Sequence, residues 1–267
     1  METQKLKSGT FMGNTQKLRA ISGFTLSRTD HDEHMKVPRH EHEHPYISLL
    51  LHGKYHEQSI VSAHDIKAGS SLYRPKGFEH KNEIGAADSL CFNIEIQKNI
   101  IDQELCKRSN NYIQFEKNSL EIMKIYYGFQ QNFSEELLNI TVEENIYHLF
   151  KQQKRALNTG RALWVNQIKK QVRLHPEIKY SIDAVSHSLH LHPNYFVRKF
   201  KETTGFTFGE FLLKQRISRS IDLMLNTNKN LTQIALESGF YDQSHFIRHF
   251  KYFFKSSPLE FRKTIKG

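Results

Sequence analysis

Hydrophobic residues follow two different periods along the chain, and the change of period divides it. From about residue 21 to residue 96 they form short runs bounded by glycine, proline or polar turn residues, a pattern typical of β-strands. From about residue 100 onward they recur every three to four residues, as on one face of a helix. The pattern predicts an α+β chain, in which a small antiparallel barrel or sandwich precedes the helices. The predicted strands are Ile21–Leu26, Tyr46–Leu51, Ser59–Val61, Ser71–Tyr73 and Leu90–Ile96.

Two amphipathic stripes follow the β-rich part. The first stripe comprises Leu120, Met123, Ile125, Tyr126 and Phe129, and the second comprises Val142, Ile146, Tyr147, Leu149 and Phe150. The acidic pair that follows Ser134 marks a helix start. Each stripe can be buried within one chain or can face a second copy. We expect residues 118–131 to contact a second copy, residues 140–151 to cover the β-rich part, and Asn158-Thr159-Gly160 to form a hinge.

A segment of about fifty residues occurs twice near the C-terminus, which is the mark of a duplicated structural unit. Each copy has a short helix, a turn, and a second helix with an apolar back and a polar front, so each copy is predicted to be a helix-turn-helix. Gly239 opens the second turn, and His190 holds the same place in the first, where its tolerance of positive φ keeps the turn possible. Ile182, Val185, Ser186 and Leu191 correspond to Leu231, Ile234, Ala235 and Phe240 at an offset of 49, and Phe196, Arg198, Phe200, Lys201 and Phe211 recur as Phe246, Arg248, Phe250, Lys251 and Phe261 at an offset of 50.

The net charge lies entirely in this duplicated part. Residues 1–160 contain 20 Lys+Arg and 20 Asp+Glu, whereas residues 161–267 contain 18 Lys+Arg and 8 Asp+Glu and so carry the whole +10. A basic part beside a neutral part is typical of a nucleic-acid-binding protein with a separate second function.

Residues 161–267 resemble the DNA-binding domain of AraC/XylS-family transcription regulators. The matching residues are Gly239-Phe240, Ser244, Phe246, Arg248, Phe250-Lys251 and Ser257-Pro258-Leu259-Glu260-Phe261-Arg262. The resemblance implies a regulator, more often an activator than a repressor, whose partners are double-stranded DNA, RNA polymerase and a second copy of the chain.

The second helix of each unit is the predicted recognition helix. Arginine can bond guanine O6 and N7 together, and asparagine or glutamine can pair with adenine in the same way. The lysines are expected at phosphates. The candidate DNA-contacting residues are His192, Asn194, Tyr195, Val197, Arg198, Lys199, Lys201, Gln243, Ser244, His245, Arg248 and Lys251.

Histidines concentrate in the β-rich part, where residues 31–80 hold nine of the 16. His40 and His42 alternate along one strand, so both side chains point to the same face. The run His40-Glu41-His42, Tyr46, Gly53 and the run Gly69, Pro75, Gly77, His80 resemble the two motifs of the cupin family of β-barrels.

The cupin resemblance implies a metal bound by His40, His42 and His80. Imidazole nitrogens suit Zn or Fe, and three of them can hold Zn with one open position. Tyr46 stands where the family has a glutamate ligand, and His44 is an alternative fourth ligand. The other possibility is that these side chains line a pocket for an organic effector. The candidate effector-pocket residues are His40, His42, Tyr46, Tyr73, His80 and Phe92, with Arg74 as a further neighbour.

These observations predict three parts: a cupin-like effector-binding barrel in residues 1–110, a helical dimerisation and linker segment in residues 111–160, and an all-α DNA-binding domain with two helix-turn-helix units in residues 161–267. We expect a ligand-controlled, sequence-specific transcription regulator without enzymatic activity. The alternatives are a metal-responsive regulator, a metal-dependent cupin enzyme fused to a DNA-binding domain, and an architectural or RNA-binding protein.

The sequence also predicts where the protein works. It has no apolar run long enough to span a membrane and no recognisable secretion signal, and two cysteines, Cys91 and Cys106, make no disulfide framework. We therefore expect a bacterial cytoplasmic protein that is associated with the nucleoid when it binds DNA.

Overall fold

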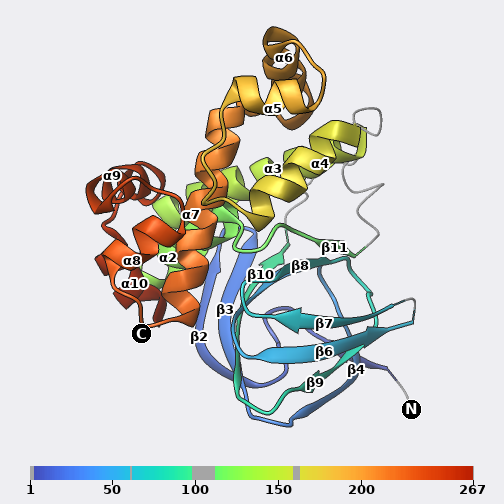
Figure 1. The fold of residues 1–267 in the computed structure, drawn as a ribbon. Coiled ribbons are helices and arrows are strands. Elements are labelled where there is room, and N and C mark those ends of the chain that lie inside the picture. The colour runs from blue at the N-terminus through green and yellow to red at the C-terminus, as the bar shows by residue number, and fades with distance from the viewer. Residues whose placement is uncertain (1–2, 61, 98–111, 159–162, 267) are drawn as a thin grey trace. The chain divides into compact units, whose positions relative to one another are not determined.

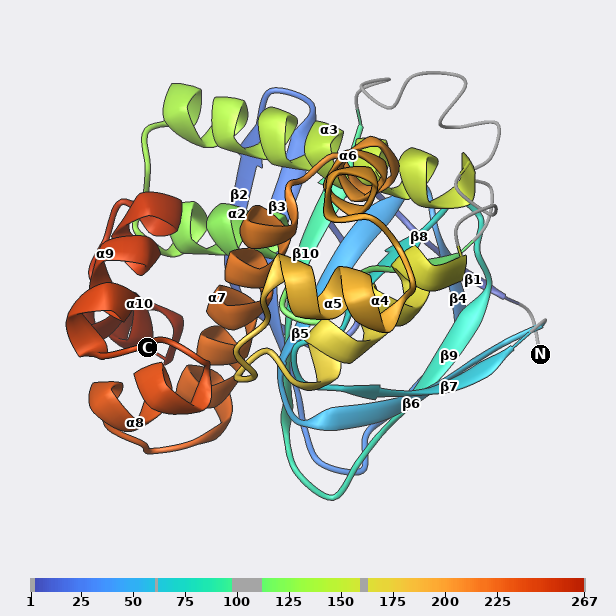
Figure 2. The ribbon, with the colours of Figure 1, turned by 45° about the horizontal axis from the view of Figure 1, so that its top comes forward.

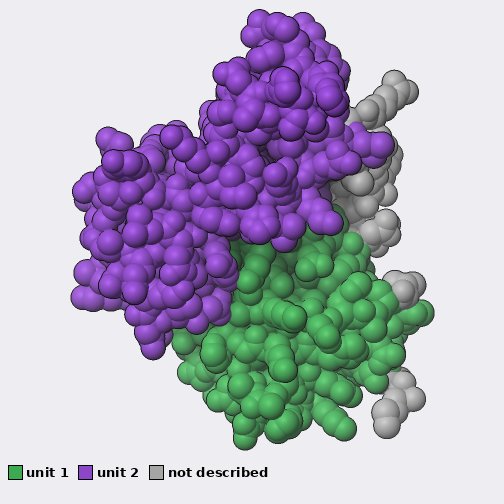
Figure 3. All heavy atoms as spheres, viewed as in Figure 1, with its two compact units in different colours: residues 1–147 green, residues 148–267 purple. Residues whose placement is uncertain are grey.

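The computed structural model of the chain describes residues 3–60, 62–97, 112–158 and 163–266 (Figure 1). The chain divides into two compact units, residues 1–147 and residues 148–267 (Figure 3). The first unit combines β-sheets with helices and the second is all helical, so the predicted α+β class is confirmed. Among the described helices, none is long and apolar enough to cross a membrane.

Two β-sheets form most of the first unit. A five-stranded sheet has the order β1-β4-β9-β6-β7, and a six-stranded sheet has the order β11-β8-β5-β10-β3-β2. Neither order returns to its first strand within the described residues, so the β-rich part consists of two sheets, which agrees with the sandwich form of the expected barrel or sandwich. The strands are β1 Gln4–Leu6, β2 Asn14–Ile21, β3 Phe24–His31, β4 Lys36–His42, β5 Tyr46–His52, β6 Lys54–Ser59, β7 Ala63–Lys67, β8 Ser71–Arg74, β9 His80–Ile84, β10 Ser89–Ile96 and β11 Ile113–Gln114.

Two of the predicted strands are displaced. The run Ile21–Leu26 is a hairpin, because β2 ends at Ile21 and β3 begins at Phe24 after a turn in which Gly23 has a φ of 83°. The run at Ser59–Val61 is only the end of β6, and its Val61 lies outside the described residues.

The helix α2 (Leu120–Gln130) packs on the six-stranded sheet. The Phe92 ring of β10 lies 5.1 Å from the Tyr126 ring and 5.2 Å from the Phe129 ring, centroid to centroid. Lys17 on β2 donates a hydrogen bond to the Phe129 carbonyl, 2.7 Å away, which places a cation where the helix exposes its last carbonyls. Eight residues of α2 are buried within the chain. The expectation that residues 118–131 contact a second copy is therefore wrong, since the core of the first unit takes up this apolar face.

The apolar residues of the helix α3 (Glu135–Asn158) are partly buried and partly exposed. Val142, Ile146, Leu149 and Phe150 are buried. In contrast, Leu137, Ile140 and Tyr147 are 47%, 46% and 50% exposed. The predicted stripe on residues 140–151 is thus buried except at Tyr147 and at Ile140. The predicted hinge begins at the last residue of α3, and its remaining residues, Thr159 and Gly160, lie outside the described residues.

The second unit repeats one structure twice, as predicted. The helix α7 runs between the two copies and packs against helices of both (Figures 1 and 2). The short helices α5 and α8 each have seven residues, and the recognition helices α6 and α9 each have 12. The helices are α4 Leu163–Leu174, α5 Ile182–Ser188, α6 Pro193–Thr204, α7 Phe208–Asn226, α8 Leu231–Glu237, α9 Gln243–Phe254 and α10 Pro258–Lys266.

The turns of the two copies match in hydrogen bonding. The Leu191 N–H donates to the Ser186 carbonyl in the first copy, and the Phe240 N–H donates to the Ala235 carbonyl in the second, both at 2.9 Å. His190 has a φ of 54°, which confirms that a histidine takes the left-handed conformation that Gly239 takes at 87°.

Candidate functional site

A pocket lies between the two sheets of the first unit, and side chains of both sheets line it. The five-stranded sheet contributes β4, β6 and β9, and the six-stranded sheet contributes β3, β5, β8 and β10. The lining residues are Phe11, Met12, His31, Val37, His40, His42, Tyr46, Ser48, Tyr55, Arg74, His80, Asn82, Ile84, Cys91 and Asn93.

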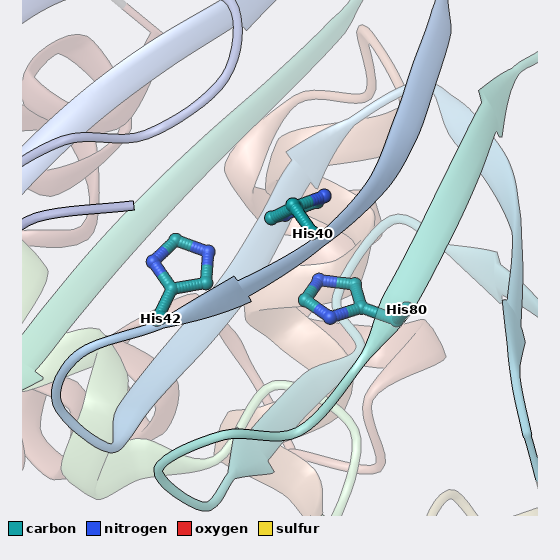
Figure 4. Close-up of side chains that lie close together, drawn as sticks. All are labelled: His40, His42 and His80. Atoms are coloured by element: carbon teal, nitrogen blue, oxygen red, sulfur yellow. The ribbon is translucent and has the colours of Figure 1, made fainter. Parts of the chain in front are cut away.

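Three histidines meet at this pocket (Figure 4). His40 and His42 alternate on β4, and His40 is paired in register with His80 on β9. One ring nitrogen from each lies within 4.8 Å of the others. All three side chains are buried, with 3% or less of their surface exposed. Alternation on one strand and register between two strands thus bring distant sequence positions to one point.

Hydrogen bonds to the backbone fix the protonation of two of these rings. His40 Nδ1 lies 2.8 Å from the Pro38 carbonyl, and His80 Nδ1 lies 3.0 Å from the Phe78 carbonyl. Because a carbonyl only accepts, each Nδ1 carries the hydrogen and each Nε2 keeps its lone pair. This arrangement is the one that orients histidine ligands in metal sites.

His42 differs from the other two histidines. Its Nδ1 is buried and has no hydrogen-bond partner among the described residues. A buried polar atom without a partner is costly, so this atom marks a place where a bound ligand would supply a bond. Burial, with smaller effects of His40 and Arg74, lowers the pKa of His42 to about 3. Burial also lowers the pKa values of His40 and His80, so the rings present lone pairs rather than positive charge.

Tyr46 completes this group. Its hydroxyl lies 3.1 Å from His80 Nε2, to which it donates, since that nitrogen holds a lone pair. Burial raises the pKa of Tyr46 well above its usual value. The pocket therefore offers two kinds of group at its centre, imidazole acceptors and one neutral phenol.

Two residues that were predicted to line the pocket lie elsewhere. Tyr73 comes directly before the pocket residue Arg74 on β8, and Phe92 lies between the pocket residues Cys91 and Asn93 on β10. Because side chains alternate along a strand, Tyr73 and Phe92 point to the opposite face of the sheet. Phe92 packs there against α2. His44, the alternative ligand, comes after β4 has ended and does not line the pocket. Glu57, which pairs with the Arg74 guanidinium beside the pocket, was not predicted from the sequence.

The second candidate site is the surface formed by the recognition helices. Arg198 and Tyr195 on α6 are exposed, as are Ser244 and Arg248 on α9. Arg198 lies 3.9 Å from Glu202 on its own helix. Arg248, in contrast, makes no ion pair or hydrogen bond with the part of the chain that the structure describes, so its guanidinium is available to a partner. The other predicted contact residues with exposed side chains are His192, Asn194, Lys201 and Lys251.

Four of the predicted contact residues are less exposed. Val197 packs against the phenylalanine core of the first copy. His245 accepts a hydrogen bond from the Tyr241 N–H through Nδ1 and its ring packs 5.5 Å from the Phe240 ring, so it belongs to the turn. The remaining two are Lys199 and Gln243.

Comparison with known proteins addresses the second unit most directly. Residues 185–264 match the family described as helix-turn-helix domain. These residues therefore form a helix-turn-helix domain, as the repeated motif predicted.

Relatives of the chain include transcription regulators. The Msm operon regulatory protein of Streptococcus mutans is 29% identical over 110 residues, which are 41% of this chain and 40% of that protein. The probable transcriptional regulator LumQ of Photobacterium leiognathi is 22% identical over 85% of this chain and 92% of that protein. ToxT from Vibrio cholerae covers 92% of this chain and 99% of its own, at 16% identity and a TM-score of 0.40. The chain spans less than half the length of the Msm operon protein.

Proposed function

We propose that this chain is a sequence-specific DNA-binding transcription regulator, controlled by a small ligand bound between the sheets of its first unit. The observation that carries the proposal is the repeated helix-turn-helix with an exposed arginine at the same place in each recognition helix, Arg198 and Arg248. An arginine on the outer face of such a helix can bond both acceptors of a guanine.

The two copies support a two-part DNA site. Equivalent recognition helices on one unit suit two successive major grooves on one side of a duplex, which lie about 34 Å apart. The positive charge of residues 161–267 supports phosphate binding on both sides of these grooves.

A selection experiment tests this function. The full chain is incubated with a library of random DNA duplexes, and the bound sequences are read after several rounds at a fixed salt concentration. We expect enrichment of two short motifs about 10–10.5 base pairs apart, one for each recognition helix. Enrichment of no sequence above the starting library would contradict the proposal and would favour an architectural protein.

We also propose a more specific regulator, one that responds to a divalent transition metal held by His40, His42 and His80. The single observation that favours it is the meeting of three buried histidines, each with one ring nitrogen within 4.8 Å of the others. Neutral imidazoles suit Zn and Fe. The metal would link His40 and His42 of β4 to His80 of the neighbouring strand β9.

Elemental mass spectrometry of the chain, purified without chelator, tests this metal site. We expect about one metal per chain, as for a site of three histidines with an open position, and none in the double variant His40→Ala/His42→Ala. The matched control is His56→Ala/His64→Ala, which removes two exposed histidines and should keep the metal. Absence of metal from the parent chain would leave the pocket to an organic ligand with hydrogen-bond donors.

We further propose that the regulator is a homodimer and that α3 supplies part of the contact. Leu137, Ile140 and Tyr147 lie three and seven positions apart, so they share one face of this helix, and each is about half exposed. An exposed apolar stripe of this kind is a common feature of a helix that packs against another.

A further inference from the structure

The side chain of Gln243 is held in one orientation by the helix before it. Gln243 is the first residue of α9, and Thr232 is the second residue of α8. The Thr232 hydroxyl donates a hydrogen bond to Gln243 Oε1 at 2.6 Å. The acceptor end of the amide is therefore turned toward α8, and the Nε2 donors are left for a partner.

The helix starts that carry Thr232 and Gln243 are themselves held by capping hydrogen bonds. Asn230 and Gln233 form a capping box at the start of α8, and the Asp242 carboxylate accepts from the His245 N–H at 2.7 Å at the start of α9. Both members of the pair thus lie in the first turn of a capped helix. A side chain fixed before binding loses less rotamer freedom when it meets DNA.

We infer that Gln243 reads its base as a hydrogen-bond donor only, and that Thr232 sets this specificity. A glutamine that recognises adenine donates to N7 and accepts from the N6 amino group with the same amide. The Thr232 hydroxyl uses one of the two lone pairs of Oε1 and holds this oxygen toward α8, so the amide does not present Oε1 and Nε2 to the same adenine together. Guanine, which presents acceptors at both N7 and O6, and thymine, with its O4, remain suitable. The inference rests on the proposed function and replaces the adenine contact expected from sequence.

The hydrogen bond between Thr232 and Gln243 has no equivalent in the first copy of the repeat. At the offsets of the repeat, Asp183 stands at the place of Thr232 and Pro193 at the place of Gln243. Neither is a hydroxyl or an amide. The two recognition helices therefore differ in what their first turns can read, which makes the two halves of the DNA site unequal.

The test uses the full chain and the same random duplex library, with four proteins compared at one salt concentration. These are the parent, Gln243→Ala, Thr232→Val, and the control Thr264→Val, which removes a hydroxyl from α10. Fluorescence of Trp164, the single tryptophan, verifies that the second unit of each variant is folded.

We expect the parent to prefer guanine or thymine over adenine at one position, and Gln243→Ala to lose that preference. Thr232→Val frees the amide to rotate, so the preference against adenine at that same position should fall by about fivefold or more, while Thr264→Val leaves it unchanged. If Thr232→Val keeps the parent's base preference, or if Gln243→Ala changes no position, the inference is wrong although DNA binding persists. A parent that selects adenine at this position also overturns it. A parent that selects no sequence refutes the proposed function itself.

Discussion

The Arg74 guanidinium and the Glu57 carboxylate form an ion pair that joins the two sheets of the first unit, with only 1% and 2% of the two side chains exposed. The Arg74 Nε donates to Glu57 Oε2 at 3.0 Å, and further hydrogen bonds reach Ser48 at 2.7 Å and Tyr55 at 3.0 Å. The guanidinium also lies 5.1 Å from the Tyr46 ring centre. Two charges can stay buried here because their hydrogen-bonding groups have partners.

Removing one member of this pair should destabilise the first unit strongly. We expect Glu57→Ala to lower its free energy of unfolding by about 3–5 kcal/mol, because the Arg74 charge is left buried without its carboxylate. Urea unfolding followed by far-UV circular dichroism measures this loss. Because the only tryptophan, Trp164, belongs to the second unit, its fluorescence transition should stay in place.

The matched control is Asp65→Ala. Asp65 on β7 pairs with His56 at the surface, at 2.8 Å, with 78% of the Asp65 side chain exposed. A surface pair is screened by water and adds little stability. An equal loss of unfolding free energy in Glu57→Ala and Asp65→Ala would contradict the role assigned to the buried pair.

The two turns of the repeat should respond in opposite ways to substitution. Gly239→Ala should destabilise the second unit by at least about 1–3 kcal/mol, the usual strain of a left-handed non-glycine residue. A Cβ at this position would also lie 2.6 Å from the Pro176 carbonyl oxygen. Urea unfolding followed by Trp164 fluorescence measures the change.

His190→Gly should instead raise stability slightly. Glycine adopts the left-handed conformation without strain, which raises the free energy of unfolding by about 1–2 kcal/mol. The extra freedom of glycine in the unfolded chain lowers it by about 0.5–1 kcal/mol. A clear loss of stability in His190→Gly would show that the histidine side chain itself supports the turn.

The start of α8 gives a third prediction. Asn230 accepts from the Gln233 N–H at 2.9 Å and caps the helix. Asn230→Ala should therefore lower the stability of the second unit by about 1 kcal/mol. The neighbouring Asn228 is exposed and lies outside both helices, so Asn228→Ala serves as control and should change little. The same loss in both variants would refute the capping role.

The apolar stripe on α3 gives a fourth prediction. Leu137→Lys/Ile140→Lys should convert a dimer into a monomer, because two charges would enter the apolar contact. Sedimentation equilibrium measures the mass of the particle. Leu174→Lys changes a leucine of α4 that is 63% exposed, and should leave the dimer intact. A parent chain that sediments as a monomer would contradict the proposed contact.

Local patterns in the sequence were sufficient to predict the second unit. Its helices start and end at residues whose backbone preference is strong, such as Pro193 and Gly205, and its phenylalanines recur at helical spacing. The repeat gave each of these signals twice. For this reason the helix-turn-helix units, and the left-handed histidine in the first of them, could be predicted from sequence.

The first unit was harder to predict, because its strands are polar. The strands β4, β6, β7 and β9 are rich in charged residues and histidine, so they lack the hydrophobic runs by which strands are recognised. The sequence could predict that His40 and His42 point to the same face, because they alternate along one strand. In contrast, the pairing of Glu57 with Arg74 depends on how two sheets face each other, which no local pattern reveals.

The position of α2 depended on tertiary packing in the same way. An amphipathic stripe predicts that a face is covered, and does not identify what covers it. Here the six-stranded sheet covers it through Phe92, a residue that sequence reasoning had assigned to the pocket. Both errors come from one missing fact, the direction in which β10 presents its alternate side chains.

The measurement that tests the central claim most directly is the ratio of specific to nonspecific DNA affinity in Arg248→Ala. The best duplex from the selection and a scrambled duplex of equal length are titrated with the parent, with Arg248→Ala and with Lys251→Ala, using fluorescence anisotropy. We predict that Arg248→Ala loses most of the preference for the selected duplex, because only the base contacts of α6 remain, whereas Lys251→Ala weakens both alike and lowers the salt slope by about 1. Arg219→Ala, at an exposed arginine of α7 that pairs with Asp222, should keep the parent's ratio. If Arg248→Ala still prefers the selected duplex as strongly as the parent does, α9 is not the helix that reads the DNA, and the account is wrong.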